Sequence, residues 1–248
     1  MSDKPRCEPL GDTALLWTWS GGIGIETSRM VLDAYRALRE DTDLVGAGMV
    51  DIVPAYNALA VHFEPAHVDL PALRERVEAV LRSVGTDATE TGQGYVAPTS
   101  VSHAYVSGEP TARAHVTREY VAHEHGASPP IHRLPVVYDG QDLSRVADHA
   151  GMSPTEVISL HLNGTYTVAM IGFRPHFPYL IGMDERLATP RLATPRTRVP
   201  AGSVGIAGSQ TGVYPEASPG GWNIIGRTDP ALLRPIRPGD LVEFQEER

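Results

Sequence analysis

Three features that are common in exported and membrane proteins are missing from this sequence of 248 residues. It contains one cysteine, Cys7, so no internal disulfide can form. No apolar run approaches the roughly 18 residues of a membrane-spanning helix, and the N-terminal segment lacks the basic and apolar parts of a secretory signal. We therefore expect a cytoplasmic protein that does not associate with membranes.

Recognisable nucleotide and nucleophile motifs are also missing. The glycine-rich residues 21–24 lack the later glycine of a dinucleotide fingerprint and the Lys-Ser/Thr pair of a phosphate-binding loop. A Gly-x-Ser-x-Gly nucleophile elbow is absent as well. His123 and His125 form a His-x-His pair, but no tight cluster of Cys, Asp or Glu accompanies them, so we predict no metal site. The sequence thus reveals no ATP site of its own.

Positive charge is scarce overall, since the net charge is −9 at pH 7. This balance disfavours nucleic acid, which binds to basic surfaces. Residues 144–161 have the spacing of a helix-turn-helix, yet their second helix offers no Lys or Arg to phosphates, so we expect no nucleic-acid partner. Residues 172–227 differ from the rest because six arginines oppose three acidic residues. That local excess favours a small anionic ligand, such as a carboxylate.

The first 84 residues predict a small α+β domain. Its strand-like runs are residues 13–19, 49–53 and 57–63, and its helical runs are 25–39 and 69–84. In the third strand, Leu59, Val61 and Phe63 would share one face. Asp69 is a plausible helix N-cap, with Pro71 in the first turn. The order β-α-β-β-α suggests a sheet with helices on one face.

Residues 85–131 lack a strong period and are rich in Gly, Ser, Thr, His and Pro, so we predict a linker or insert there. Residues 132–248 form the predicted second domain. In it, Asp142 is positioned to cap a helix, and Ser153 and Glu156 form a capping box around Pro154. Its predicted elements are strands at 134–138 and 165–171, helices at 143–150 and from 154 to about 163, and an ordered, turn-rich stretch at 172–229.

Two sets of residues are candidates for a functional site on their spacing alone. His161 shares an apolar helical stripe with Val157, so it is either a hydrogen-bonded core residue or a wall of an active site. Arg191 and Arg196 end the two copies of a five-residue repeat, and in a straight extended chain they would point to opposite faces. These arginines either bind a ligand across a bend or brace a solvated loop.

Short polar residues between two glycines are a further candidate. Ser209, Gln210 and Thr211 lie between Gly208 and Gly212, an arrangement that allows backbone amides and small side chains to approach a ligand closely. We expect this segment to be a loop that offers hydrogen-bond donors.

Several blocks of the chain are typical of one protein family. The C-terminal blocks are GFRPHFPYL at 172–180, LATPRLATPRTRVPAGSVGIAGSQTGVYP at 187–215 and SPGGWNIIGRT at 218–228. The N-terminal blocks are PLGDTALL at 9–16 and VPAYNALAVHFEP at 53–65. In this order they resemble the allophanate hydrolase subunit 1 family, which includes the B subunit of bacterial 5-oxoprolinase and the kinase inhibitor KipI. The resemblance implies a small N-terminal α+β domain followed by a C-terminal, cyclophilin-like β-barrel domain.

The same resemblance implies a function that depends on partners. The chain would be the B subunit of a complex that converts 5-oxoproline to glutamate at the expense of ATP, and would be inactive alone. Its partners would be a companion related to allophanate hydrolase subunit 2 and a protein like the A subunit of 5-oxoprolinase, with ATP bound by the complex rather than by this chain. One alternative is the carboxyltransferase subunit of a urea carboxylase or allophanate hydrolase system, which would use biotin. The other is a KipI-like inhibitor of a sensor histidine kinase.

The chain departs from the family pattern at His176, where the usual residue is glycine. If this position requires a positive φ, the histidine either accepts strain or shifts the turn. Its imidazole would then lie on the surface or at the site. We expect catalytic roles for His161, His176 and Gln210. The residues expected to contact the substrate are Phe173, Phe177, Tyr179, Arg191, Arg196, Ser209, Thr211, Tyr214, Trp222 and Arg227.

Overall fold

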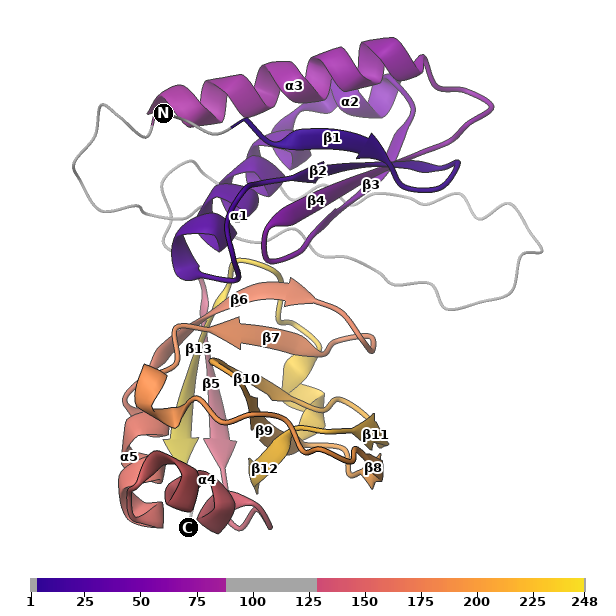
Figure 1. Ribbon diagram of the computed structural model, residues 1–248. Helices are drawn as coiled ribbons and strands as arrows, with labels where there is room; N and C mark the ends of the chain where they lie inside the picture. The colour runs from indigo at the N-terminus through magenta and orange to yellow at the C-terminus, as the bar shows by residue number, and fades with distance from the viewer. Residues whose placement is uncertain (1–3, 88–128, 248) are drawn as a thin grey trace. The chain divides into compact units, whose positions relative to one another are not determined.

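The chain divides into two compact units, Met1–Gly94 and Tyr95–Arg248, in a computed structural model that describes residues 4–87 and 129–247 (Figure 1). The boundary lies among residues 88–128, outside the described residues, as do His123 and His125. The predicted linker or insert at 85–131, and the domain limits 1–84 and 132–248, therefore stay predictions. None of the helices in the two described ranges is long and apolar enough to cross a membrane.

The N-terminal unit is an antiparallel sheet covered by helices. Its strands lie in the order β1-β2-β4-β3. They are β1 (Arg6–Pro9), β2 (Ala14–Thr18), β3 (Met49–Pro54) and β4 (Ala58–Phe63), and the helices are α1 (Ile25–Glu40), α2 (Thr42–Gly46) and α3 (Leu70–Asp87). Leu59, Val61 and Phe63 share a buried core with Val31 of α1 and Leu73 of α3. The predicted strands and helices are confirmed, while β1 and α2 have no counterpart among the predictions.

The C-terminal unit is built on a seven-stranded sheet that closes almost completely into a barrel (Figure 1). The strand order is β12-β9-β10-β7-β6-β13-β5, and only the β13–β5 pairing is parallel. The strands are β5 (Ile131–Val136), β6 (Thr165–Ile171), β7 (Pro178–Ile181), β9 (Ser203–Ala207), β10 (Gln210–Val213), β12 (Asn223–Arg227) and β13 (Leu241–Glu246). Just beyond β5, Val137 forms a bridge with Arg227 of β12, which joins the two edges. The predicted α+β class with a C-terminal barrel is confirmed.

Two helices pack against this barrel. Helix α4 (Leu143–Ala150) contacts β12, and α5 (Pro154–Leu162) contacts β13. The predicted capping box is present, because the Ser153 hydroxyl accepts from the Glu156 amide while the Glu156 carboxylate accepts from the Ser153 amide. Gly151 ends α4 in the left-handed conformation at φ 65°, where glycine is favoured. The helix-turn-helix spacing therefore serves to pack two helices on a sheet.

A small two-stranded sheet, β8 (Arg196–Val199) with β11 (Ser218–Gly220), accompanies a second apolar cluster outside the main barrel core. Val204, Ile206, Val213 and Ile225 face the barrel interior. Because side chains alternate along a strand, Ala207 and Ile224 face the other way and belong to the second cluster. Short 3-10 turns, η1 (Glu185–Leu187) and η2 (Pro230–Leu233), complete the unit. The second cluster draws residues from all three C-terminal family blocks: Phe177, Val199, Ala207, Tyr214, Trp222 and Ile224.

Candidate functional site

Four aromatic residues of the second apolar cluster, together with Phe173 whose ring contacts it, come from three family blocks, and we call these five the aromatic cluster: Phe173, Phe177, Tyr179, Tyr214 and Trp222. The Phe177 ring lies at the centre, with ring centroids 4.9 Å from Tyr179, 5.2 Å from Tyr214 and 5.4 Å from Trp222. Most of these pairs are edge-to-face, the arrangement that the quadrupole of aromatic rings favours. The three C-terminal family blocks therefore meet in space at one packed group of rings.

Glycines in the strands make room for these rings. A Cβ atom added at Gly212 of β10 would lie 2.8 Å from the Pro178 carbonyl oxygen and 3.0 Å from the Trp222 ring. A Cβ at Gly205 of β9 would lie 3.2 Å from the Cβ of Trp222. At Gly220 of β11, an added Cβ would collide with the Tyr214 hydroxyl. The glycine-rich sequence thus permits close approach between aromatic rings and backbone.

The aromatic cluster has a buried part and an accessible part. Phe177, Tyr214 and Trp222 are 1%, 1% and 5% exposed, whereas Phe173 is 56% exposed and Tyr179 is partly exposed. The exposed Arg191 places its guanidinium carbon 6.0 Å from the centre of the Trp222 ring, within the range of a cation–π interaction. A ligand approaching this face would contact Phe173, Tyr179 and Arg191, with the buried rings as support.

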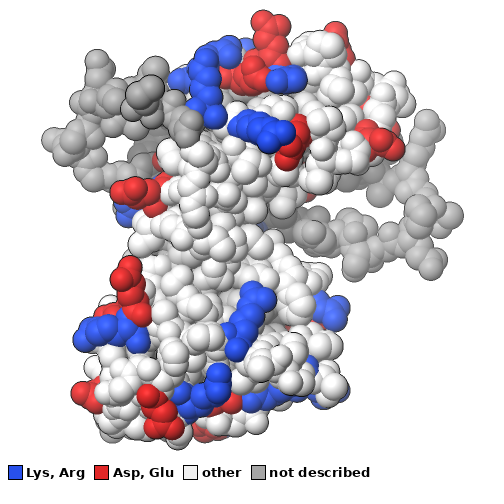
Figure 2. Space-filling view, in the orientation of Figure 1, with Lys and Arg blue, Asp and Glu red and all other residues white. Residues whose placement is uncertain are grey.

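The surroundings of Tyr179 and Tyr214 keep both hydroxyl groups neutral, so that each is a hydrogen-bond donor near the positive charge of Arg191. Burial raises the pKa of the Tyr179 hydroxyl, and the charge of Arg191 offsets part of this rise. Burial also raises the pKa of Tyr214. A hydrogen bond with the Trp222 backbone and the charges of Arg191 and Arg196 lower it by a smaller amount. Both phenols are therefore protonated at neutral pH. Figure 2 shows that part of this unit's visible surface is uncharged around single basic side chains, while acidic and further basic side chains lie toward its left and lower edges.

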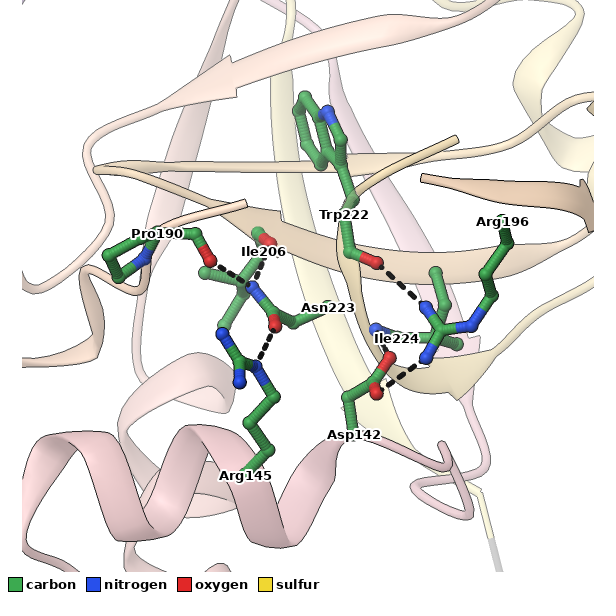
Figure 3. Close-up of polar contacts among 8 residues, drawn as sticks. All are labelled: Asp142, Arg145, Pro190, Arg196, Ile206, Trp222, Asn223 and Ile224. Atoms are coloured by element: carbon green, nitrogen blue, oxygen red, sulfur yellow. Dashed lines mark hydrogen bonds and ion pairs between the residues drawn. The ribbon is translucent and has the colours of Figure 1, made fainter. Parts of the chain in front are cut away.

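Arg196 is tied into the scaffold behind the cluster (Figure 3). Its guanidinium donates to the Asp142 carboxylate at 2.6 Å and to the Trp222 carbonyl at 3.3 Å. The other Asp142 oxygen accepts the Ile224 amide at 2.7 Å. Figure 3 shows the Trp222 ring pointing away from this carbonyl, so Arg191 meets the ring and Arg196 meets the backbone of one residue. The two arginines of the repeat thus contact different parts of Trp222: Arg191 lies over the ring and Arg196 donates to the backbone carbonyl.

Asp142, Arg145 and Asn223 are parts of this scaffold that sequence patterns did not assign to the site. Asp142 occupies the N-cap position of α4, as predicted, but makes no side-chain capping bond there; the prediction of its capping role is wrong because its carboxylate serves Arg196 and Ile224 instead. Asn223 donates to the Pro190 and Ile206 carbonyls and accepts from Arg145 of α4 (Figure 3). No short motif signals such contacts, since each joins residues far apart in the sequence.

The turn between β6 and β7 carries His176 and Phe173, both at positive φ (67° and 66°). The Phe177 amide donates to the Arg174 carbonyl at 3.1 Å, which encloses Pro175 and His176. Proline at the second position and positive φ at the third are the features of a type II turn, where glycine is preferred. The conditional expectation of a positive φ at His176 therefore holds, and the histidine accepts strain rather than shifting the turn.

His161 and Thr211 lie together in the barrel core, apart from the aromatic cluster. His161 is 0% exposed, and burial lowers the pKa of its imidazole to about 3. Its Nε2 lies 3.0 Å from the Thr211 hydroxyl, which itself donates to the Gly205 carbonyl. Its Nδ1 lies 2.8 Å from the Tyr138 hydroxyl. Because the Thr211 hydroxyl donates its proton to the Gly205 carbonyl, the imidazole of His161 donates from Nε2 to Thr211 and accepts at Nδ1 from Tyr138. This geometry is that of a neutral, hydrogen-bonded core histidine.

The remaining predicted site residues lie at the hairpin and the barrel closure. Residues 210–213 form strand β10 rather than an open loop, and the Gly208 amide is already bonded to the Thr189 carbonyl at 2.7 Å. Ser209 is exposed in the β9–β10 turn, and Gln210 is 8% exposed. Arg227 pairs with Asp139 at 2.8 Å beside the Val137 bridge. The segment expected to offer free donors therefore uses much of its backbone in the sheet.

The class of this protein is defined by an α+β chain whose second unit is a nearly closed seven-stranded barrel, with residues of the three C-terminal family blocks packed in a second apolar cluster outside the main core. The model of the carboxyltransferase domain, subdomain C and D, matches residues 5–240. The chain therefore belongs to this family, which confirms the resemblance drawn from the sequence blocks.

Relatives agree with this assignment. The chain is 35% identical over 257 aligned residues to a protein of Bacillus subtilis (strain 168) named as the B subunit of 5-oxoprolinase, and the match covers 98% of this chain and 93% of the relative. It is 53% identical over 125 residues to a protein of the same name from Escherichia coli O157:H7, covering 46% of this chain and 57% of that relative. The Kluyveromyces lactis urea carboxylase structure superposes with a TM-score of 0.69 at 16% identity, over 100% of this chain and 22% of that one, which supports the fold alone.

Proposed function

We propose that this chain is the B subunit of an ATP-dependent 5-oxoprolinase-type complex, which opens the lactam of 5-oxoproline to give glutamate. The observation that carries the proposal is the convergence of Arg191 with the aromatic cluster on one face of the barrel. The names of the relatives that match the chain support the same reaction.

The exposed face would bind the substrate by charge and by shape. Arg191 would pair with the carboxylate, because a guanidinium presents two parallel donors to a planar anion. Phe173 and Tyr179 would border the flat lactam ring, and the neutral phenol of Tyr179 would donate to an oxygen of the substrate. The buried Phe177, Tyr214 and Trp222 rings would hold these groups in place. With exposed groups that contact the substrate and buried rings that support them, this chain would orient the substrate.

A companion protein would complete the site. The sequence of this chain lacks a phosphate-binding loop, so we assign ATP to a companion related to allophanate hydrolase subunit 2 or to one like the A subunit of 5-oxoprolinase. Co-expression of the three proteins tests the proposal. We expect release of glutamate from 5-oxoproline only with ATP and all three proteins, and an assembled complex without that activity would refute it.

The carboxyltransferase reaction is a second candidate, because the family model that matches 5–240 carries that description. This chain shows no Met-Lys-Met biotin-carrier site, so a carrier protein would have to deliver carboxybiotin. Transfer of labelled carboxylate from carboxybiotin to urea by the same purified complex would support this candidate. Absence of transfer in a complex that releases glutamate would remove it.

A further inference from the structure

Two arginines outside the family blocks lie close to the strained turn that carries His176. Strand β13 runs antiparallel to β6, with Leu241 opposite Thr167. The pairing continues backward along the chain, because the Gly239 amide donates to the Val168 carbonyl and the Val168 amide donates to the Asp240 carbonyl. The residues that precede β13 therefore run beside β6 toward its far end, where the β6–β7 turn begins. Arg234 and Arg237 lie on this segment, and the charges of both act on the His176 imidazole, which places them near the turn.

The Arg237 guanidinium is held in place by hydrogen bonds from Nη1, whereas its Nε has no hydrogen-bond partner among the described residues. Its Nη1 donates to the Arg234 carbonyl at 2.6 Å and to the Ile236 carbonyl at 2.9 Å. The Nε itself is buried. A buried donor without a partner is costly, so an acceptor placed at this Nε would stabilise the arrangement. The Nε edge of a guanidinium is one that carboxylates and phosphates bind in a bidentate manner.

The charges around this edge are unbalanced. Within the described ranges, neither Arg234 nor Arg237 is part of an ion pair. The nearby Asp240 carboxylate is already engaged, since one of its oxygens accepts from the Arg237 amide and lies 2.8 Å from Nε2 of His132. Partial burial, followed by the charges of Arg237 and Arg234, lowers the pKa of His176. The imidazole is thus a neutral donor beside two cations.

His176 accepts an unfavourable backbone conformation in order to lie there. A histidine at φ 67° costs more than the glycine that a type II turn favours. Such strain persists where the surroundings hold the residue in place, and it often marks a functional position. The structure therefore combines a strained donor, an exposed cation and a buried unpartnered guanidinium edge within one small region.

We propose that His176, Arg234 and Arg237 form a binding site for a phosphoryl group, in which two guanidinium groups balance the two negative charges and the imidazole donates a third hydrogen bond. The site is independent of the proposed 5-oxoprolinase activity. The phosphoryl group would belong either to inorganic phosphate or to the end of a polyphosphate chain.

Titration of the whole chain with inorganic phosphate, pyrophosphate and acetate at constant ionic strength tests the site. Histidine ring signals report binding in protein labelled with ¹³C-histidine, and the His176→Gly variant identifies the signal of His176 among the ten histidines. We expect a saturable shift of that signal with phosphate or pyrophosphate, together with a higher pKa of His176. Tighter binding of pyrophosphate would indicate a polyphosphate ligand, and tighter binding of phosphate a free ion. No effect of acetate is expected.

Three variants separate a built site from general attraction to positive charge. Arg237→Gln and Arg234→Gln should each weaken phosphate binding by about tenfold or more, because a hydrogen bond to a charged group is lost. Arg198→Gln removes the same charge from an exposed position of the same unit and should leave binding unchanged. The exposed Arg234 keeps the test valid if Arg237→Gln fails to fold. A shift that never saturates, or equal losses in all three variants, would overturn the proposal.

Discussion

Asp142 and Arg196 form an ion pair of 2.6 Å that links the start of α4 to the start of β8. Their side chains are only 8% and 24% exposed, and both also bond to the backbone at Trp222 and Ile224. The pair therefore fixes the segment that carries the Trp222 ring of the aromatic cluster. The contribution of this pair to the free energy of unfolding can be compared with that of the exposed pair between Asp139 and Arg227.

Replacing Asp142 with alanine should lower the free energy of unfolding by about 3 kcal/mol, because a mostly buried guanidinium and a buried amide lose their acceptor. Urea denaturation measures the change. The control is Asp139→Ala, which breaks the pair with Arg227 whose side chains are 50% and 64% exposed. That loss should stay below about 1 kcal/mol. Equal losses in the two variants would contradict a special role for Asp142.

Replacing His176 with glycine should raise the free energy of unfolding by about 1 kcal/mol, because glycine adopts a positive φ without strain. Thermal or urea denaturation detects such a change. His67→Gly provides the comparison, since His67 is exposed and does not have a positive φ. It should be neutral or slightly destabilising, because glycine increases the freedom of the unfolded chain. A destabilised His176→Gly variant would show that the imidazole stabilises the turn by more than the strain costs.

Replacing Arg191 with glutamine in the assembled complex should lower kcat/KM for 5-oxoproline by about 10- to 100-fold, as expected for the loss of a charged hydrogen bond to the substrate. Most of the effect should lie in KM if Arg191 binds the ground state and the transition state equally. Steady-state glutamate release measures both constants. The Arg198→Gln variant removes an arginine of the same unit and should behave like the parent. Unchanged kinetics in Arg191→Gln would remove this residue from the site.

Stability should fall below neutral pH because of His161. Burial lowers the pKa of its imidazole to about 3 from the ordinary value of 6.5. Between these values the unfolded chain binds a proton that the folded chain does not, so the free energy of unfolding decreases as pH falls, by up to about 1.4 kcal/mol per pH unit. In the His161→Gln variant, the free energy of unfolding from urea denaturation should change less with pH between about pH 7 and about pH 5. His149→Gln, which removes an exposed histidine of the same unit, is the control for loss of an imidazole as such.

Local patterns predicted the elements of this fold well where they were long or capped. The helix at 143–150, the capping box at Ser153 and the strand at 165–171 all lie where periodicity and capping placed them. The four-residue β1 ends in proline, and α2 has five residues, so neither offers a window long enough to show a period. Sequence patterns are weakest for elements of this length.

The site was harder to predict because its contacts join distant segments. The family blocks identified Phe177, Tyr214 and Trp222, and the structure brings them together. Residue spacing could not show that Thr211 turns into the barrel toward His161, since this depends on the facing of one strand within a closed sheet. It also could not show that the Asp142 carboxylate bonds to Arg196 and Ile224 rather than to its own helix.

The closure of the barrel bears on how the protein behaves at high concentration. Residues 137–142 run along β12 and occupy its outer backbone groups, through bonds between Val137 and Arg227, from Gly140 to Ile225 and from Asp142 to Ile224. An unpaired edge strand is a template on which another chain can add a strand and begin to aggregate. This segment therefore protects the β12 edge, and variants that loosen it should precipitate before they lose their core.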